Sequence, residues 1–211
     1  MLENYTYNNY DTQPDPPHQP MYLKKILRIL SSETQAKMIL DAGCGDGNFA
    51  ESLAEKGYNM YGVDLSESGI RLANERSCGT FKVASMYDNL IHPFLGVEAF
   101  DAIIAIDTLE HLYSPRIFVS RTFQVLKGGG ILIVTVPYWG YLKNIALSIT
   151  NRIDRTLTPL WDGGHIKHWS RKTLTELMVE QSYEVVSFQG CGRPIPYLWN
   201  EMMMVFRKPD F

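Results

Sequence analysis

The chain has 211 residues, of which 45% are hydrophobic and 20% are charged, and its formal net charge is −3. This composition is typical of a folded globular protein with enough apolar residues to bury a core. The net charge gives no overall basic footprint, so we expect no nucleic-acid partner.

The three cysteines, Cys44, Cys78 and Cys191, are widely spaced and form no Cys-x-x-Cys pair. The pattern is not a disulfide framework and is typical of a reducing compartment. The longest apolar stretch, residues 131–142, is shorter than the roughly 20 residues that span a bilayer. The N-terminus also lacks the basic-then-apolar order of a signal peptide. The sequence therefore predicts a cytoplasmic protein without a transmembrane segment.

Residues 1–20 are rich in Tyr, Asn, Asp and Pro and show no periodicity, so we expect an N-terminal arm. Residues 21–211 are predicted to form a single domain, in which strands and helices alternate after a leading helix. Helices are predicted over residues 21–30, 47–56, 66–76 and 115–126, and strands over residues 37–41, 59–64, 80–84, 100–106 and 130–136.

The predicted strands are strongly apolar and lack the period-two alternation of a half-exposed sheet. Strands of this kind are covered on both faces, as in a parallel sheet. Together with the alternating order of the elements, they predict a doubly wound α/β fold.

The pattern changes after Pro137. Residues 138–168 contain many aromatic residues and no clear strand, and we interpret them as a substrate-binding insertion with a helix over 141–157. A helix capped by Ser170 is predicted to follow. The last two predicted strands, 184–188 and 202–206, can pair as an antiparallel hairpin.

Three glycines at alternate positions, Gly43, Gly45 and Gly47, follow the first predicted strand. Glycine tolerates positive φ, and its missing Cβ lets the backbone approach a ligand closely, here at the carboxyl end of a strand. A dinucleotide site would need a third glycine where Asn48 stands, and the charge of Asp46 would oppose a phosphate. A P-loop is excluded because no Gly-Lys-[Ser/Thr] follows.

Asp64 closes the second predicted strand at about 20 residues from the glycines, the spacing expected for a carboxylate that binds ribose hydroxyls. The ligand therefore carries a ribose but no phosphate in the glycine loop. An adenosine attached to an amino acid satisfies both conditions.

Four segments of the sequence together resemble the class I S-adenosylmethionine-dependent methyltransferases. In chain order they are Ile39-Leu40-Asp41-Ala42-Gly43-Cys44-Gly45-Asp46-Gly47, Gly62-Val63-Asp64-Leu65-Ser66, Phe100-Asp101-Ala102-Ile103-Ile104 with Leu109-Glu110-His111-Leu112, and Leu126-Lys127-Gly128-Gly129-Gly130. The resemblance implies a Rossmann-like sheet of seven strands in an α/β/α arrangement, mostly parallel with an antiparallel C-terminal strand. It also implies S-adenosylmethionine as the methyl donor. Closer neighbours look like ubiquinone-type and other small-molecule O-methyltransferases.

The resemblance also assigns roles to residues. Asp41 and Gly43 would hold the methionine amino end, Asp64 the ribose, and Leu65 would lie against the adenine. After the third strand, where many members have an acidic residue that accepts from the adenine amino group, this chain has a serine and a methionine. The implied cofactor-binding residues are Asp41, Gly43, Gly45, Gly47, Asp64, Leu65, Ser85, Met86 and Ile106, with Asp107 beside the transfer path.

Methyl transfer from a sulfonium is an in-line displacement that needs alignment and the exclusion of water. A hydroxyl acceptor also benefits from losing its proton, and histidine is suited to take it. We therefore predict O-methylation of a small molecule (phenolic, sugar or lipid-linked) with His111, His165 or His168 as the base. The spacing of His165 and His168 also invites a metal site, but no third and fourth ligand are evident, so we expect no metal.

The insertion carries four aromatic residues, which either bind an apolar or ring-bearing acceptor or pack the insertion onto the domain. They are Tyr138, Trp139, Tyr141 and Trp161. Its predicted helix also carries Lys143, Arg152 and Arg155, and a basic amphipathic helix can make peripheral contact with a membrane.

Two classes of function remain open from the sequence. The first is the methyltransferase, and the second is a catalytically silent module of the same fold that binds the nucleoside cofactor or a partner. A nicotinamide-dependent oxidoreductase is a more distant third hypothesis.

Overall fold

The computed structural model of the chain describes residues 19–33, 36–90, 93–94, 96–157, 159–161 and 164–210. The predicted N-terminal arm lies outside the described residues, except for its last two, which begin the first helix. That helix, α1, runs over Gln19–Glu33.

Seven strands of the described chain form one sheet in the order β3-β2-β1-β4-β5-β7-β6. They are β1 (Met38–Ala42), β2 (Asn59–Asp64), β3 (Gly79–Val83), β4 (Phe100–Ile106), β5 (Leu126–Pro137), β6 (Glu184–Cys191) and β7 (Glu201–Arg207). The first five pair in parallel, and β7 runs antiparallel between β5 and β6. The predicted doubly wound sheet with an antiparallel C-terminal strand is confirmed, as is the predicted C-terminal hairpin.

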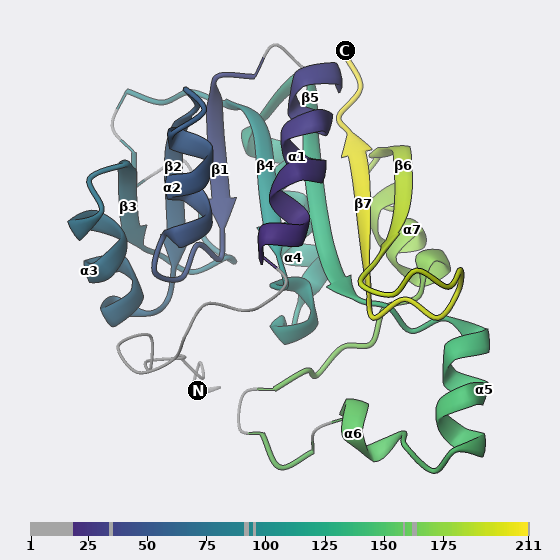
Figure 1. The fold of residues 1–211 in the computed structure, drawn as a ribbon. Coiled ribbons are helices and arrows are strands. Elements are labelled where there is room, and N and C mark those ends of the chain that lie inside the picture. The colour runs from purple at the N-terminus through teal and green to yellow at the C-terminus, as the bar shows by residue number, and fades with distance from the viewer. Residues whose placement is uncertain are drawn as a thin grey trace.

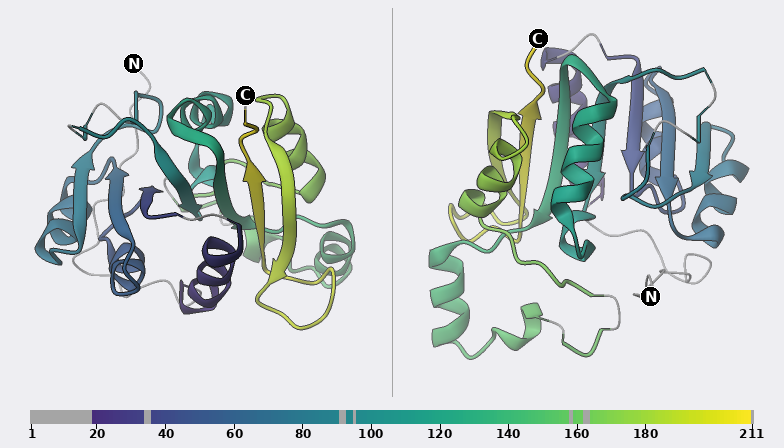
Figure 2. Two further views of the ribbon diagram at one scale, coloured as in Figure 1. Left: turned by 90° about the horizontal axis from the view of Figure 1, so that it is seen from above. Right: turned by 180° about the vertical axis from the view of Figure 1, so that it is seen from behind.

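Helices cover both faces of this sheet (Figures 1 and 2). After α1 the helices of the described chain are α2 (Asn48–Ala54), α3 (Glu67–Glu75), the short 3-10 helix η1 (Leu109–His111), α4 (Pro115–Val125), α5 (Tyr141–Ile149), α6 (Asp154–Leu157) and α7 (Arg171–Val179). Of these, α5 and α6 lie beyond the end of the sheet and cover neither face (Figure 1). Successive side chains of a strand point to opposite faces. Ala102 and Ile104 of β4 accordingly pack with α1, α2 and α3, whereas Ile103 and Ala105 pack with α4 and α7.

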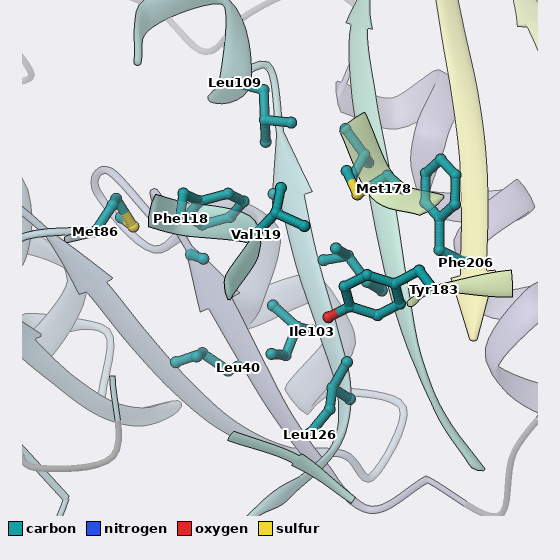
Figure 3. Packing of buried hydrophobic residues seen from close by; sticks show 14 of the residues in the cluster. Leu40, Met86, Ile103, Leu109, Phe118, Val119, Leu126, Met178, Tyr183 and Phe206 are labelled. Atoms are coloured by element: carbon teal, nitrogen blue, oxygen red, sulfur yellow. The ribbon is translucent and has the colours of Figure 1, made fainter. Parts of the chain in front are cut away.

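Figure 3 shows the core on the α4 and α7 side of the sheet, where Ile103 of β4 lies among Phe118, Val119 and Met178. Full burial of each such side chain contributes roughly 1.5–3 kcal/mol. The one hydroxyl drawn there, that of Tyr183, is satisfied because it donates to Thr122 Oγ1 at 3.1 Å. This core holds the strands in register and so fixes where their carboxyl ends lie.

Two predicted helix starts at serine residues are confirmed. Ser66 Oγ accepts from the backbone N–H of Gly69 at 3.1 Å and caps α3. Ser170 Oγ accepts from the backbone N–H of Thr173 at 3.2 Å, and Thr173 Oγ1 accepts from that of Ser170 at 3.1 Å, so α7 begins with a capping box.

Three predicted elements differ from the structure. The strand β3 lies at the sheet edge, so it buries Phe81 alone and is not covered on both faces. The strand β5 begins at Leu126, which pairs with Phe100 of β4, and so starts ahead of the strand predicted over residues 130–136. The helix predicted over residues 141–157 ends at Ile149, close to Asn151, whose φ of 52° interrupts the helix.

The insertion is joined to the domain at both ends. Tyr138 and Trp169 form a β-bridge, and the backbone N–H of Trp139 donates to Trp169 O at 2.9 Å. Farther along, the backbone N–H groups of Ile166 and Lys167 both donate to Glu110 O at 2.9 Å. The insertion, with α5 and α6, therefore lies beyond the carboxyl ends of the parallel strands (Figure 1).

Lys143 does not lie on a basic outer face of α5, as the membrane hypothesis requires. It is buried, and its Nζ donates to Tyr138 O at 2.9 Å and to Asn200 O at 3.1 Å, because those two carbonyls meet at the base of the insertion. Burial lowers the pKa of Lys143. The exposed side of α5 instead carries apolar residues, among them Tyr141, Leu142 and Ile149. No helix in the described ranges is long and apolar enough to cross a bilayer.

We expect Lys143→Met to loosen the insertion, since it keeps the length of the side chain but removes both hydrogen bonds to the carbonyls of Tyr138 and Asn200. The free energy of unfolding should fall by roughly 1–3 kcal/mol. Proteolysis within residues 141–161 should speed up more than proteolysis elsewhere. Lys172→Met, on an exposed side chain of α7, is the control, and an equal effect of the two variants would contradict this role of Lys143.

Candidate active site

The carboxyl ends of β1 and β2 bring together the residues that were predicted from the glycine motif. The pairing register places Ala42 beside Val63, so Gly43 follows β1 at the level where Asp64 ends β2. The backbone N–H of Gly43 donates to Val63 O at 2.9 Å and fixes this turn to the neighbouring strand.

All three glycines of the turn have positive φ: 93° at Gly43, 53° at Gly45 and 76° at Gly47. This is the region that favours glycine. At two of them a side chain would also collide with the protein, because a Cβ would lie 2.5 Å from Thr108 Oγ1 at Gly43 and 2.8 Å from Ala73 Cβ at Gly47. Turn geometry and packing thus require these two glycines whether or not a ligand is present.

Asp64 is held by the loop that it faces. One of its carboxylate oxygens accepts from the backbone N–H of Gly45 at 3.0 Å, and the other accepts from that of Ser66 at 2.8 Å. Burial raises the pKa of Asp64, and these backbone N–H groups oppose that rise. Each carboxylate oxygen can accept more than one hydrogen bond, so the group is oriented and still able to bind vicinal hydroxyls.

Asp41 is buried at the end of β1, with 2% of its surface exposed. Burial, and then the nearby carboxylate of Asp64, raise the pKa of Asp41 to about 8. A buried acid of this kind is neutral at neutral pH unless a cation approaches it. The site therefore favours a ligand with a positive group beside Asp41.

Asp46 is engaged in an ion pair within the protein. Its Oδ2 lies 2.9 Å from Arg76 Nη2, but Arg76 also binds Glu51 at 2.6 Å, so one positive charge is shared between two carboxylates. The argument that Asp46 opposes a phosphate stays a prediction. The second argument against a dinucleotide site is that Asn48 is the first residue of α2, where the dinucleotide pattern needs a glycine.

The residues predicted near the adenine are partly engaged in the fold. Ser85 Oγ accepts from the backbone N–H of Tyr87 at 3.2 Å. Met86 is a core residue, packed in the cluster that Figure 3 shows. Leu65 and Ile106 are half-buried at the carboxyl ends of β2 and β4. An adenine contact by these residues remains a prediction.

Two of the three candidate histidines lie together. The rings of His111 and His165 are 5.0 Å apart, and Trp161 lies against both, at 5.5 and 5.4 Å. The exposed side chain of His168 lies instead against Trp139, at 4.2 Å between ring centres. Burial, and then His111, lower the pKa of His165 to about 4, so His165 is a neutral imidazole at physiological pH.

Glu110 joins this pair and was not among the predicted catalytic residues. Its side chain is fully buried, neither carboxyl oxygen has a hydrogen-bond partner among the described residues, and Oε1 lies 4.0 Å from His165 Nε2. Burial, and then Asp107, raise the pKa of Glu110 well above its ordinary value. In the sequence, the only feature that pointed to a role for Glu110 was its place beside His111 in the motif Leu109-Glu110-His111-Leu112.

Asp107 connects the two parts of the site, because it follows β4 directly and precedes η1. Its φ of 49° is uncommon outside glycine and is held by Thr135, whose Oγ1 donates to Asp107 Oδ1 at 2.8 Å and accepts from its backbone N–H at 3.0 Å. The buried hydroxyl of Tyr22 in α1 also donates to Asp107, at 3.5 Å.

A family model described as a methyltransferase domain matches residues 18–188 of the chain. A probable S-adenosylmethionine-dependent methyltransferase of Mycolicibacterium smegmatis is 26% identical over 171 residues, or 79% of this chain and 61% of that protein. A ubiquinone biosynthesis O-methyltransferase of Psychrobacter cryohalolentis is 29% identical over 107 residues, or 47% of this chain and 40% of that protein. A solved structure of a putative methyltransferase from Bacillus halodurans has a TM-score of 0.69 at 16% identity, over 89% of this chain and 99% of that one.

These comparisons differ in what they support. The chain spans 61% and 40% of the lengths of the two curated relatives, so their activities as whole proteins do not transfer directly. The likeness to the solved structure shows the fold. The family model covers most of the domain, including β1, β2 and β4, whose carboxyl ends form the site.

We expect Asp41→Asn to stabilise the unliganded protein at alkaline pH. An unfolded aspartate titrates near 3.9. Between that value and about 8, the folded protein holds a proton on Asp41 that the unfolded chain has lost, so stability falls as the pH rises through this window. Asparagine keeps the shape of the neutral acid and removes this penalty.

Urea unfolding at pH 5 and pH 8 measures the effect. The free energy of unfolding of Asp41→Asn, relative to the natural protein, should increase by at least about 1 kcal/mol from pH 5 to pH 8. A difference between the two proteins that is independent of pH would contradict the burial of a protonated Asp41.

Proposed function

This chain belongs to the methyltransferase-domain family, and we propose that it binds S-adenosylmethionine and transfers the methyl group to a hydroxyl oxygen of a small-molecule acceptor. The observation that carries the proposal is the oriented carboxylate of Asp64, held by Gly45 N–H at the end of β2. The names of relatives as S-adenosylmethionine-dependent and ubiquinone O-methyltransferases support the same class of reaction.

The residues at the carboxyl ends of β1 and β2 fit this cofactor. Asp41 is a buried acid that a positively charged amino group would stabilise in its ionised form. Asp64 retains acceptor capacity for two ribose hydroxyls. Gly43 and Gly45, both with positive φ, leave the backbone of the turn free of side chains at these two positions.

When bound, the sulfonium supplies an electrophilic methyl group. The task of the protein is then to align the acceptor oxygen with that carbon, exclude water and accept the proton of the hydroxyl. We assign the handling of the proton to the cluster of Glu110, His111 and His165, which follows Asp107 at the end of β4. Trp161 beside both histidine rings gives this part of the site an apolar, aromatic wall that suits a ring-bearing acceptor.

The insertion supports the same arrangement. Because Ile166 and Lys167 bind the backbone carbonyl of Glu110, the segment that carries His165 is fixed to the helix that carries His111. The acceptor would therefore lie between the insertion and the ends of the parallel strands. His168, exposed beside Trp139, is not part of the proposed catalytic group.

The first test is cofactor binding by calorimetry with S-adenosylmethionine and S-adenosylhomocysteine. We expect Asp64→Asn to weaken both by roughly 10- to 100-fold, since it removes the charge that strengthens the hydrogen bonds to the ribose. Glu55→Gln, which removes an exposed carboxylate at the end of α2, should bind like the natural protein. Absence of cofactor binding in the natural protein would contradict the proposal, and cofactor binding without methyl transfer to a hydroxyl acceptor would favour the silent module.

The second test addresses the hydroxyl. We expect His165→Ala to lower kcat by about 10²- to 10⁴-fold while cofactor affinity stays the same, because the imidazole acts on the acceptor proton and not on the cofactor. Turnover of a hydroxyl acceptor is followed by release of S-adenosylhomocysteine. Unchanged turnover in both His165→Ala and His111→Ala would contradict the assignment.

A further inference from the structure

We propose that Glu110, His111 and His165 bind a divalent transition-metal ion, such as Zn²⁺, with a coordination position open toward the acceptor. The metal site itself is argued from these residues and their surroundings and does not depend on the proposed function. Only its role toward an acceptor hydroxyl rests on the proposed function. Such a site revises the expectation from the sequence, which considered His165 with His168 and found no further ligands.

The three side chains already lie close to the geometry of a metal site. Each offers one ligand atom, and these atoms all lie within 4.8 Å of one another. The pair Glu110 Oε1 and His165 Nε2 is 4.0 Å apart. Ligands of a tetrahedral Zn²⁺ at about 2.1 Å stand about 3.4 Å from each other. Small side-chain rotations, closing the pairs by roughly 1 Å, would therefore complete the coordination.

The buried carboxyl of Glu110 points independently to a ligand. Both of its oxygens are buried and have no hydrogen-bond partner among the described residues, although its backbone carbonyl accepts two hydrogen bonds. A buried polar group without partners costs roughly 1–3 kcal/mol, and more when it is charged. A cation bound by this carboxyl would remove that cost.

The charges around the cluster also favour a cation. Asp107 and Glu201 place further negative charge near Glu110. His165, whose Nε2 faces the Glu110 carboxyl, offers an imidazole nitrogen as a ligand. Lys143 and Lys167 do not fill this role, since Lys143 binds two carbonyls at the base of the insertion and Lys167 lies over Tyr113.

The donor set selects the kind of ion. Two imidazoles and one carboxylate suit Zn²⁺ and similar first-row ions better than Mg²⁺, which prefers oxygen ligands. Three protein ligands with one open position are typical of catalytic sites, and four are typical of structural ones. His168 is turned toward Trp139 and is not one of the three grouped residues.

The ion would activate the acceptor as follows. Bound to the ion, the hydroxyl would have a lower pKa and would lose its proton to water. Glu110, His111 and His165 would then handle the proton through the ion that they hold, and not by taking it themselves. The resulting oxygen forms a bond to the methyl carbon while the bond from that carbon to sulfur breaks, and the sulfur leaves as a neutral thioether. The net change is one methyl transferred and one proton released, with no oxidation or reduction.

The test uses the full chain without a histidine tag, treated with a chelator and then titrated with Co²⁺, which reports its coordination by visible absorption, and with Zn²⁺ in calorimetry. We expect one ion per chain in the natural protein. Glu110→Gln and His165→Ala should each weaken binding by at least about tenfold, because each removes a ligand. His168→Ala, a histidine three positions away and outside the cluster, should bind like the natural protein.

Failure of Co²⁺ and Zn²⁺ to bind, or equal binding by His165→Ala and the natural protein, would overturn the proposal. If Glu110→Gln fails to fold, the partly exposed His165 decides the outcome through its own variant. Calorimetry with S-adenosylhomocysteine on the same metal-free sample separates the two proposals. Cofactor binding without ion binding rejects only the metal site, and ion binding without cofactor binding rejects only the proposed function.

Discussion

The burial of carboxyl groups at the carboxyl edge of the sheet is the constraint on which the site depends. Asp41 lies beside Asp64 at the ends of β1 and β2, and Glu110 lies beside Asp107 after β4. Removing these groups from water costs free energy that the apolar core on both faces of the sheet must offset. Such a cost is recovered when cations bind, and the two proposals accordingly assign one positive partner to each of the two groups of carboxyls.

The fold places the two groups of carboxyls, Asp41 with Asp64 and Glu110 with Asp107, in parts of the site that we propose have different tasks. The turn after β1 is rigid because packing against Thr108 and Ala73 leaves no room for side chains at Gly43 and Gly47. The proposed cofactor site is therefore built into the sheet. The proposed acceptor side is assembled from distant segments, since the carbonyl of Glu110 holds residues 166 and 167 of the insertion. We infer that relatives with the same turn can differ in acceptor by changing the insertion.

The sheet and the turn could be predicted from the sequence because their signals are local. The bounds of β2 and β4 follow from apolar runs, and the start of α3 follows from Ser66 as a cap. The cluster around Glu110 could not be predicted in this way. Its member His165 lies far from Glu110 and His111 in the chain, and no local pattern tells that the Glu110 carboxyl is buried without a hydrogen-bond partner among the described residues. Lys143 was misjudged for the same reason, because the carbonyl of Asn200 that it binds belongs to another segment.

Proton release on cofactor binding tests the central claim, that a buried, protonated Asp41 receives the positive end of S-adenosylmethionine. Calorimetry at pH 6.5 in two buffers with different ionisation enthalpies counts the protons exchanged. Because the pKa of Asp41 is about 8 in the unliganded protein, the account predicts that about one proton is released per cofactor bound, and none in Asp41→Asn. Binding without proton release in the natural protein would contradict it.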